Sequence, residues 1–196
     1  MVFNHLTSHT HNDKIKLVIL MKNDTTLTAF HCPRWKELPD MDLYMDQVVT
    51  LLNTYLKDFC LEQQGKAITS TMINNYVKHG IVTPPVKKRY NRKHLAYLIV
   101  VCILKTVFRM DEISDLIRVQ MDMYPQDQAY DYFCAELECC LYSICTHKRV
   151  KHIPSDDEGS PIVDLIRNTI QAVAYTAYVR DAVRNYERDT DTGKDD

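Results

Sequence analysis

Glycine is scarce in this sequence, with only four residues among 196, and strand-like alternation of apolar and polar residues is hard to find. Both observations favour helices. The chain also lacks an apolar run long enough to cross a membrane, because its longest run, residues 98–104, lies in a helical pattern with charged neighbours. It has no glycine-rich phosphate loop, nucleophile elbow or HExxH pair, so no enzymatic activity, catalytic residue or cofactor is expected.

Cysteine occurs seven times, an odd number, without a secretory signal. This predicts reduced thiols in a cytoplasmic protein. One group of cysteines lies near two histidines in the last third of the chain: Cys134, Cys139, Cys140, Cys145, His147 and His152. Compact zinc sites usually have paired cysteines separated by two residues, and this spacing is absent. Small buried thiols on a helix face are the preferred interpretation, and no metal site is expected.

Acidic residues are missing from one long stretch, between Glu62 and Asp111. At the average acidic frequency of the chain, roughly six would be expected there. The stretch instead contains nine basic residues: Lys66, Lys78, Lys87, Lys88, Arg89, Arg92, Lys93, Lys105 and Arg109. A net charge of −2 therefore hides a basic island between acidic flanks. Such an island is typical of a phosphate-binding surface, although a solvated basic face on an ordinary domain explains the charge equally well.

The pattern of apolar residues divides the chain into four parts. They are a poorly ordered N-terminal extension at 1–32, a compact domain at 33–122, a C-terminal helical region at 127–188 and a frayed tail at 189–196. In the compact domain, helical spacing begins at Asp42 and continues to Phe59, and Gly65 suits the end of that first helix.

A short second helix is predicted over residues 70–79. Its start is indicated by the hydroxyl-rich run Thr69–Ser70–Thr71, whose side chains can accept the free N–H groups of a first turn, and its end by Gly80. The double proline at 84–85 cannot lie inside a helix. Residues 84–90 are therefore expected to form a small β wing from two short extended pieces.

Two further helices are expected to follow, one capped by Asn91 and one starting at Asp111. This order is that of a winged helix-turn-helix, so the predicted fold class is all-α with a small β wing, followed by C-terminal helices. The outward face of the short helix offers small polar and amide side chains that can read base edges in a major groove. The wing can place Lys87, Lys88 and Arg89 beside neighbouring phosphates.

The same residues carry a resemblance. The run from Thr71 to Pro85, followed by Tyr90 and by 110–113, resembles the DNA-binding domain of the MerR family. More narrowly, residues 33–122 resemble an uncharacterised bacterial group, domain of unknown function 1836, which is itself described as MerR-like. The resemblance implies that Tyr76 touches the DNA backbone and that the basic wing residues contact DNA. The expected DNA-binding residues are Ser70, Thr71, Asn74, Asn75, Tyr76, Lys78, Lys87, Lys88, Arg89, Tyr90 and Arg92.

This chain departs from the MerR pattern at several points. Asn74 stands where that family usually carries an arginine, and Val77 stands where it carries an acidic residue. The short wing lacks the usual Gly-Tyr-Arg. The promoter-untwisting mechanism is therefore not carried over, and plain operator binding is expected.

The last third is expected to form a helix over 128–147, an acidic linker over 155–161 and a near-heptad seam over 162–177. The seam either pairs two chains, which predicts a homodimer on double-stranded DNA, or packs inside one chain against the preceding helix. The tyrosines of this region either pack between helices or line a pocket for a small-molecule effector: Tyr130, Tyr132, Tyr142, Tyr175 and Tyr178. The expected function is transcriptional regulation, and the alternative is a protein-interaction module on the same scaffold.

Overall fold

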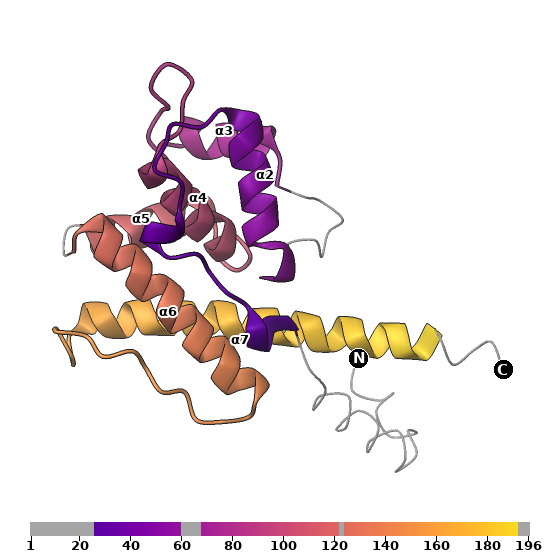
Figure 1. Ribbon diagram of the computed structural model, residues 1–196. Coiled ribbons are helices and arrows are strands. Elements are labelled where there is room, and N and C mark those ends of the chain that lie inside the picture. The colour runs from indigo at the N-terminus through magenta and orange to yellow at the C-terminus, as the bar shows by residue number, and fades with distance from the viewer. Residues whose placement is uncertain (1–25, 60–67, 122–123, 192–196) are drawn as a thin grey trace, which may run out of the picture.

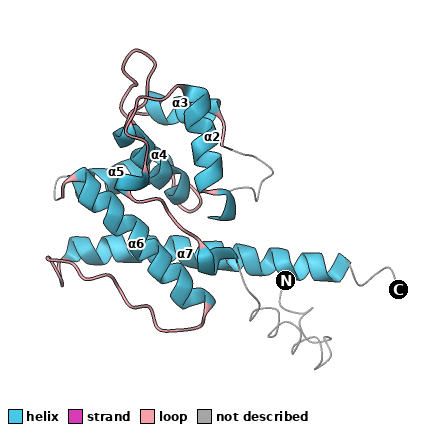
Figure 2. Cartoon of the chain, viewed as in Figure 1, coloured by secondary structure: helices cyan, strands magenta, loops and turns pink. Residues whose placement is uncertain are grey.

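The computed structural model describes residues 26–59, 68–121 and 124–191, and it is mostly helical (Figures 1 and 2). The α-helices of these ranges are α2 (Met45–Tyr55), α3 (Ser70–Lys78), α4 (Arg92–Leu104), α5 (Met110–Met121), α6 (Gln126–Cys145) and α7 (Pro161–Asp191). Short 3-10 turns lie at Thr26–Ala29, Trp35–Glu37 and Lys57–Phe59. The helical class predicted from composition and periodicity is confirmed.

The expected β wing is reduced to two isolated bridges within the described ranges, Leu43 with Tyr90 and Val86 with Arg89. Pro84 and Pro85 lack the N–H groups that a longer ladder would need, so the two predicted extended pieces do not form paired strands. The predicted wing is therefore a connecting loop that contains a tight turn at residues 86–89.

The first helix begins at Met45 rather than Asp42, because the backbone of Leu43 is paired with Tyr90. The amide N of Leu43 donates to the carbonyl O of Tyr90 at 2.8 Å, and the reverse bond measures 2.9 Å. A residue held extended by this pairing cannot join a helix. The helix ends at Tyr55, and the predicted end near Gly65 lies outside the described residues.

The centre of the N-terminal half is α4, whose Leu95, Leu98 and Ile99 are fully buried. Helices α2 and α3 pack beside it, and α5 follows it in the chain (Figure 1). Because neighbours cover α4 on several sides, it lacks the one-sided apolar stripe of a surface helix. Helix α2 contacts both α4 and α3, so it links the short helix to the centre of this half.

The N-terminal extension predicted over 1–32 is partly wrong. Residues 1–25 lie outside the described ranges, but Leu27, Phe30 and Cys32 are buried. The turn at 26–29 packs against α6, and the rings of Phe30 and Phe59 lie 5.1 Å apart. This segment is therefore part of the core.

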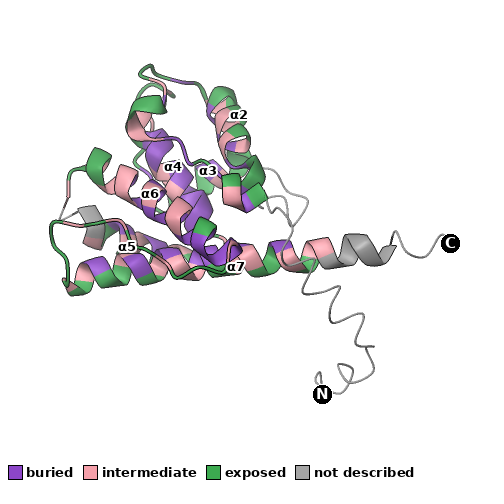
Figure 3. Ribbon diagram, turned by 60° about the horizontal axis from the view of Figure 1, so that its bottom comes forward, coloured by how far each residue is buried: buried purple, intermediate pink, exposed green. Residues whose placement is uncertain are grey.

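Helix α6 crosses α7 and packs against it (Figure 1). The seam residues Ile170, Val173 and Ala177 are buried within one chain, and Figure 3 shows buried positions along α7. The intrachain alternative therefore applies to these three residues. None of the helices in the described ranges combines the length and apolar character that spanning a bilayer requires.

Candidate nucleic-acid interface

Helix α3 presents one buried and one exposed face. The Oγ1 of Thr69 caps its start by accepting from the amide N of Met72 at 3.3 Å, as the hydroxyl-rich run predicts. Ile73 and Tyr76 point inward at 0% and 4% exposure. The outward residues are all exposed: Ser70, Thr71, Asn74, Asn75 and Lys78.

The start of α3 is tied to α2 by Asn53. Its Nδ2 donates to the carbonyl O of Ile68 at 2.9 Å, and its Oδ1 accepts from the amide N of Ile68 at 2.9 Å. The Asn53 side chain therefore pairs with both backbone groups of Ile68, the residue just before the Thr69 cap, as a neighbouring strand would. This contact fixes where the short helix begins relative to the helix behind it.

The basic turn at residues 86–89 has a defined conformation. Lys87 and Lys88 have φ values of 50° and 63°, and the amide N of Arg89 donates to the carbonyl O of Val86 at 2.9 Å. Two central residues with positive φ define a type I′ turn, which normally favours Asn and Gly. Both lysines are exposed, and the turn lies at the same end of the molecule as α3 (Figure 1).

Two of the predicted contact residues are engaged inside the chain. The guanidinium carbon of Arg89 lies 4.2 Å from the centre of the Tyr44 ring, and its Nη2 donates to the Tyr44 hydroxyl at 2.6 Å. Arg92 donates from Nε to the carbonyl O of Leu38 at 3.1 Å and pairs with Asp40 at 3.5 Å. These arginines hold the residues before α2 against the start of α4.

The two tyrosines taken from the MerR resemblance belong to the core. Tyr76 is 4% exposed and Tyr90 is 3% exposed, and burial raises the pKa of both phenols. The Tyr76 side chain packs inward from α3, so little of its surface is available for the DNA-backbone contact that the resemblance implies, and that contact remains a prediction. Tyr90 packs edge-on against His94 at a ring distance of 5.6 Å.

The basic island is bordered by carboxylates in space, although none occurs within it in sequence. The bridge from Leu43 to Tyr90 brings exposed Asp40 and Asp42 to the start of α4. Nothing in the spacing of the sequence indicates this approach. The positive surface without nearby carboxylates is therefore smaller than the nine basic residues of the island suggest. It consists mainly of the exposed Lys78, Lys87 and Lys88.

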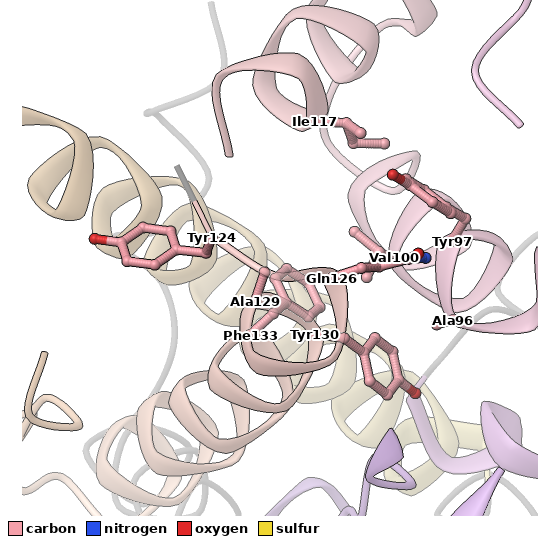
Figure 4. Close-up of a pocket in the computed structure, with 9 residues that line it drawn as sticks. All are labelled: Ala96, Tyr97, Val100, Ile117, Tyr124, Gln126, Ala129, Tyr130 and Phe133. Carbon is pink, nitrogen blue, oxygen red and sulfur yellow. The ribbon is translucent and has the colours of Figure 1, made fainter. Parts of the chain in front are cut away.

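An apolar pocket lies between α4, α5 and α6 (Figure 4). Val100, Ile117, Tyr130 and Phe133 are among the residues that line it. The cavity holds about 40 Å³, which is far below the roughly 300 Å³ of a small-molecule site. Tyr130 donates instead to the carbonyl O of Pro33 at 2.7 Å, so packing describes this tyrosine better than effector binding.

The cysteines and histidines grouped in sequence do not share one site. The Sγ of Cys134 lies 3.2 Å from that of Cys32, whereas the Sγ of Cys139 donates to the carbonyl O of Lys151 at 2.6 Å. Cys140 instead meets His152 and a residue that the sequence did not single out, Glu136. Burial, followed by the nearby carboxylate, raises the pKa of the Cys140 thiol.

Fold and surface together define a helical protein in which a short helix with a polar outward face and a lysine turn lie at one end. The profile of the family described as "Domain of unknown function (DUF1836)" matches residues 33–133, just over half of the chain. The chain therefore belongs to this family. No curated protein and no solved structure matches it significantly.

Proposed function

We propose that this protein is a DNA-binding transcriptional regulator with a MerR-like winged-helix arrangement, which inserts α3 into the major groove. The observation that carries the proposal is the outward face of α3, which is exposed, polar and free of carboxylates. A helix fits the major groove, where amide side chains can pair with base edges. Helix α2 packs against α3, and the inward residues Ile73 and Tyr76 are buried.

The exposed residues of this end divide into two roles. Asn74 and Asn75 are placed to read bases, because asparagine can form a two-bonded contact with adenine. Lys78, Lys87 and Lys88 would neutralise phosphates, which position the protein without specifying sequence. The hydroxyls of Ser70 and Thr71, in the first turn of α3, would add hydrogen bonds to the DNA backbone.

Three lysines are few for one tight complex, so we propose that two copies bind two half-sites. Three residues of the seam, Ile170, Val173 and Ala177, are buried inside the chain, so we propose that pairing uses another surface. The outward side of α7 carries exposed apolar residues at Leu165, Tyr175, Val179 and Val183. The last three follow each other at intervals of one helical turn and form a stripe.

The test is fluorescence anisotropy on DNA selected by the protein from a random pool. Asn74→Ala and Asn75→Ala should cost on the order of 1–3 kcal/mol at one base position and leave random DNA bound as before. Asn168→Ala is the matched control, because Asn168 is an equally exposed asparagine on α7. Equal losses on selected and random DNA would contradict a base-reading role for α3.

A second candidate, a protein-interaction module, is favoured by exposed apolar residues beside the turn. Met41, Tyr44 and Val86 are 66%, 49% and 70% exposed, and the two backbone bridges bring their segments together. A Met41→Ser, Val86→Ser variant separates the two functions. Unchanged DNA affinity with loss of a protein partner would favour the interaction module, whereas no binding of wild-type protein to any DNA would remove the regulator.

A further inference from the structure

Three side chains that could each donate a ligand atom to a metal ion lie together on α6 and on the segment that follows it, away from α3. Glu136 and Cys140 stand one turn apart on α6, so their side chains share a face. His152 reaches the same point from the segment that joins α6 to α7. One ligand atom from each residue lies within 4.8 Å of the other two.

Glu136 is the unusual member of the cluster because its side chain is 0% exposed. Its Oε2 accepts from the amide N of Ile153 at 2.7 Å, and its Oε1 is hydrogen-bonded to the Nδ1 of His152. The Sγ of Cys140 donates to the same Oε1 at 3.6 Å. A carboxylate is kept in such a place only when cations or donors surround it.

We propose that Glu136, Cys140 and His152 bind a zinc ion. Zinc takes tetrahedral sets of thiolate, imidazole and carboxylate ligands at about 2.0–2.3 Å, which separates neighbouring ligand atoms by roughly 3.3–3.8 Å. The Sγ of Cys140 and the Oε1 of Glu136 already lie 3.6 Å apart, which is within that range. A set containing sulfur and nitrogen favours zinc over magnesium or calcium, which prefer oxygen ligands.

The cluster is more exposed at His152 than at Cys140. The side chain of His152 is 32% exposed, whereas Cys140 is 0% exposed. The adjacent Cys139 is engaged with the carbonyl O of Lys151, so the fourth ligand is water or a small external group. An open position of this kind distinguishes zinc sites that exchange ligands from closed structural sites.

The site would control how α6 and α7 are joined. Arg167 of α7 donates to the carbonyl O of Ile153 at 2.7 Å and to both carboxylate oxygens of Glu158. It also donates to the hydroxyl of Tyr132 on α6 at 3.0 Å. Zinc on His152 would therefore fix a segment that already connects both helices, and its binding free energy would add to the stability of the folded state.

The test uses the full-length protein freed of metal by chelation, with cobalt as a spectroscopic probe and zinc as the competitor. One equivalent of cobalt should give a thiolate-to-cobalt charge-transfer band that zinc abolishes, and zinc should raise the Tm. Cys140→Ser should lose the band. His152→Gln should weaken zinc binding by roughly 100-fold, since even loss of an outer-shell partner costs about 10–100-fold.

Two matched controls keep the result specific. Cys139→Ser removes the neighbouring thiol, and His147→Gln removes the neighbouring exposed histidine, so both should keep the band and the affinity. His152 is partly exposed, and its variant should fold even if Cys140→Ser does not. Cobalt binding without the band, or equal zinc affinity in wild type and His152→Gln, would overturn the site. Neither result bears on DNA binding by α3.

Discussion

Replacing Lys87 by Asn and Lys88 by Gly would separate the fold of the basic turn from its proposed function. Both positions have positive φ, at 50° and 63°, a conformation that costs a non-glycine residue about 1–2 kcal/mol. Asn-Gly is the preferred pair for a type I′ turn. Glycine also makes the unfolded chain more flexible, which offsets about 0.5–1 kcal/mol. The expected net effect is stabilisation by about 0.5–1 kcal/mol.

The same double variant removes two positive charges from the proposed phosphate contacts. The slope of log affinity against log salt should flatten by about two units, because each neutralised phosphate contributes about 0.9. Guanidinium unfolding would measure the stability, and anisotropy titrations at several salt concentrations would measure the slope. A control in which Arg149 and Lys151 become Gln removes equal charge from the α6–α7 segment and should leave the slope unchanged.

The two measurements refute different steps of the reasoning. A more stable variant with an unchanged salt slope would show that the turn does not contact phosphates. A less stable variant would contradict the type I′ conformation. Because the expected changes in stability and affinity have opposite signs, damage to the fold cannot imitate the predicted loss of binding.

Three further predictions follow from other contacts. Asn53→Ala should destabilise the protein by about 1–3 kcal/mol in urea unfolding, because it leaves both backbone groups of Ile68 without their partner, and Asn185→Ala on α7 is the control. Burial alone would raise the pKa of Glu138, but bonds from Arg34 and the amide of Cys32 lower it below its ordinary 4.5. The Arg34–Glu138 pair therefore stabilises the folded state above that pH, and this stability is lost as the pH falls through the lowered pKa of Glu138. Arg34→Gln should reduce the fall of the Tm at acid pH, and an unchanged fall would refute the assignment. Light scattering should give a dimer that Val179→Lys with Val183→Lys converts to a monomer, and a monomeric wild type would remove the proposed pairing.

Several features of the molecule could be read from local sequence. The Thr69 cap, the closing Gly80 and the two faces of α3 all lie within one short segment. Their spacing therefore indicates which side chains share a face. The start of α2 could not be predicted in this way, because it depends on the pairing of Leu43 with Tyr90. The form of the wing was also missed, because the prolines at 84–85 block the strand pairing that it needed. The segment at 26–32 was misjudged because its few apolar residues show no period, although each is buried.

The sequence by itself determined the helical class, the start of α3 and the polar character of its outward face, since these depend on residues within a few positions of each other. Only the tertiary structure decided that Tyr76 and Tyr90 are buried, that Asp40 approaches Arg92, and that Glu136 meets His152. Such contacts depend on how whole elements pack. The backbone pairing of Leu43 with Tyr90 joins segments whose separate patterns carry no signal of one another.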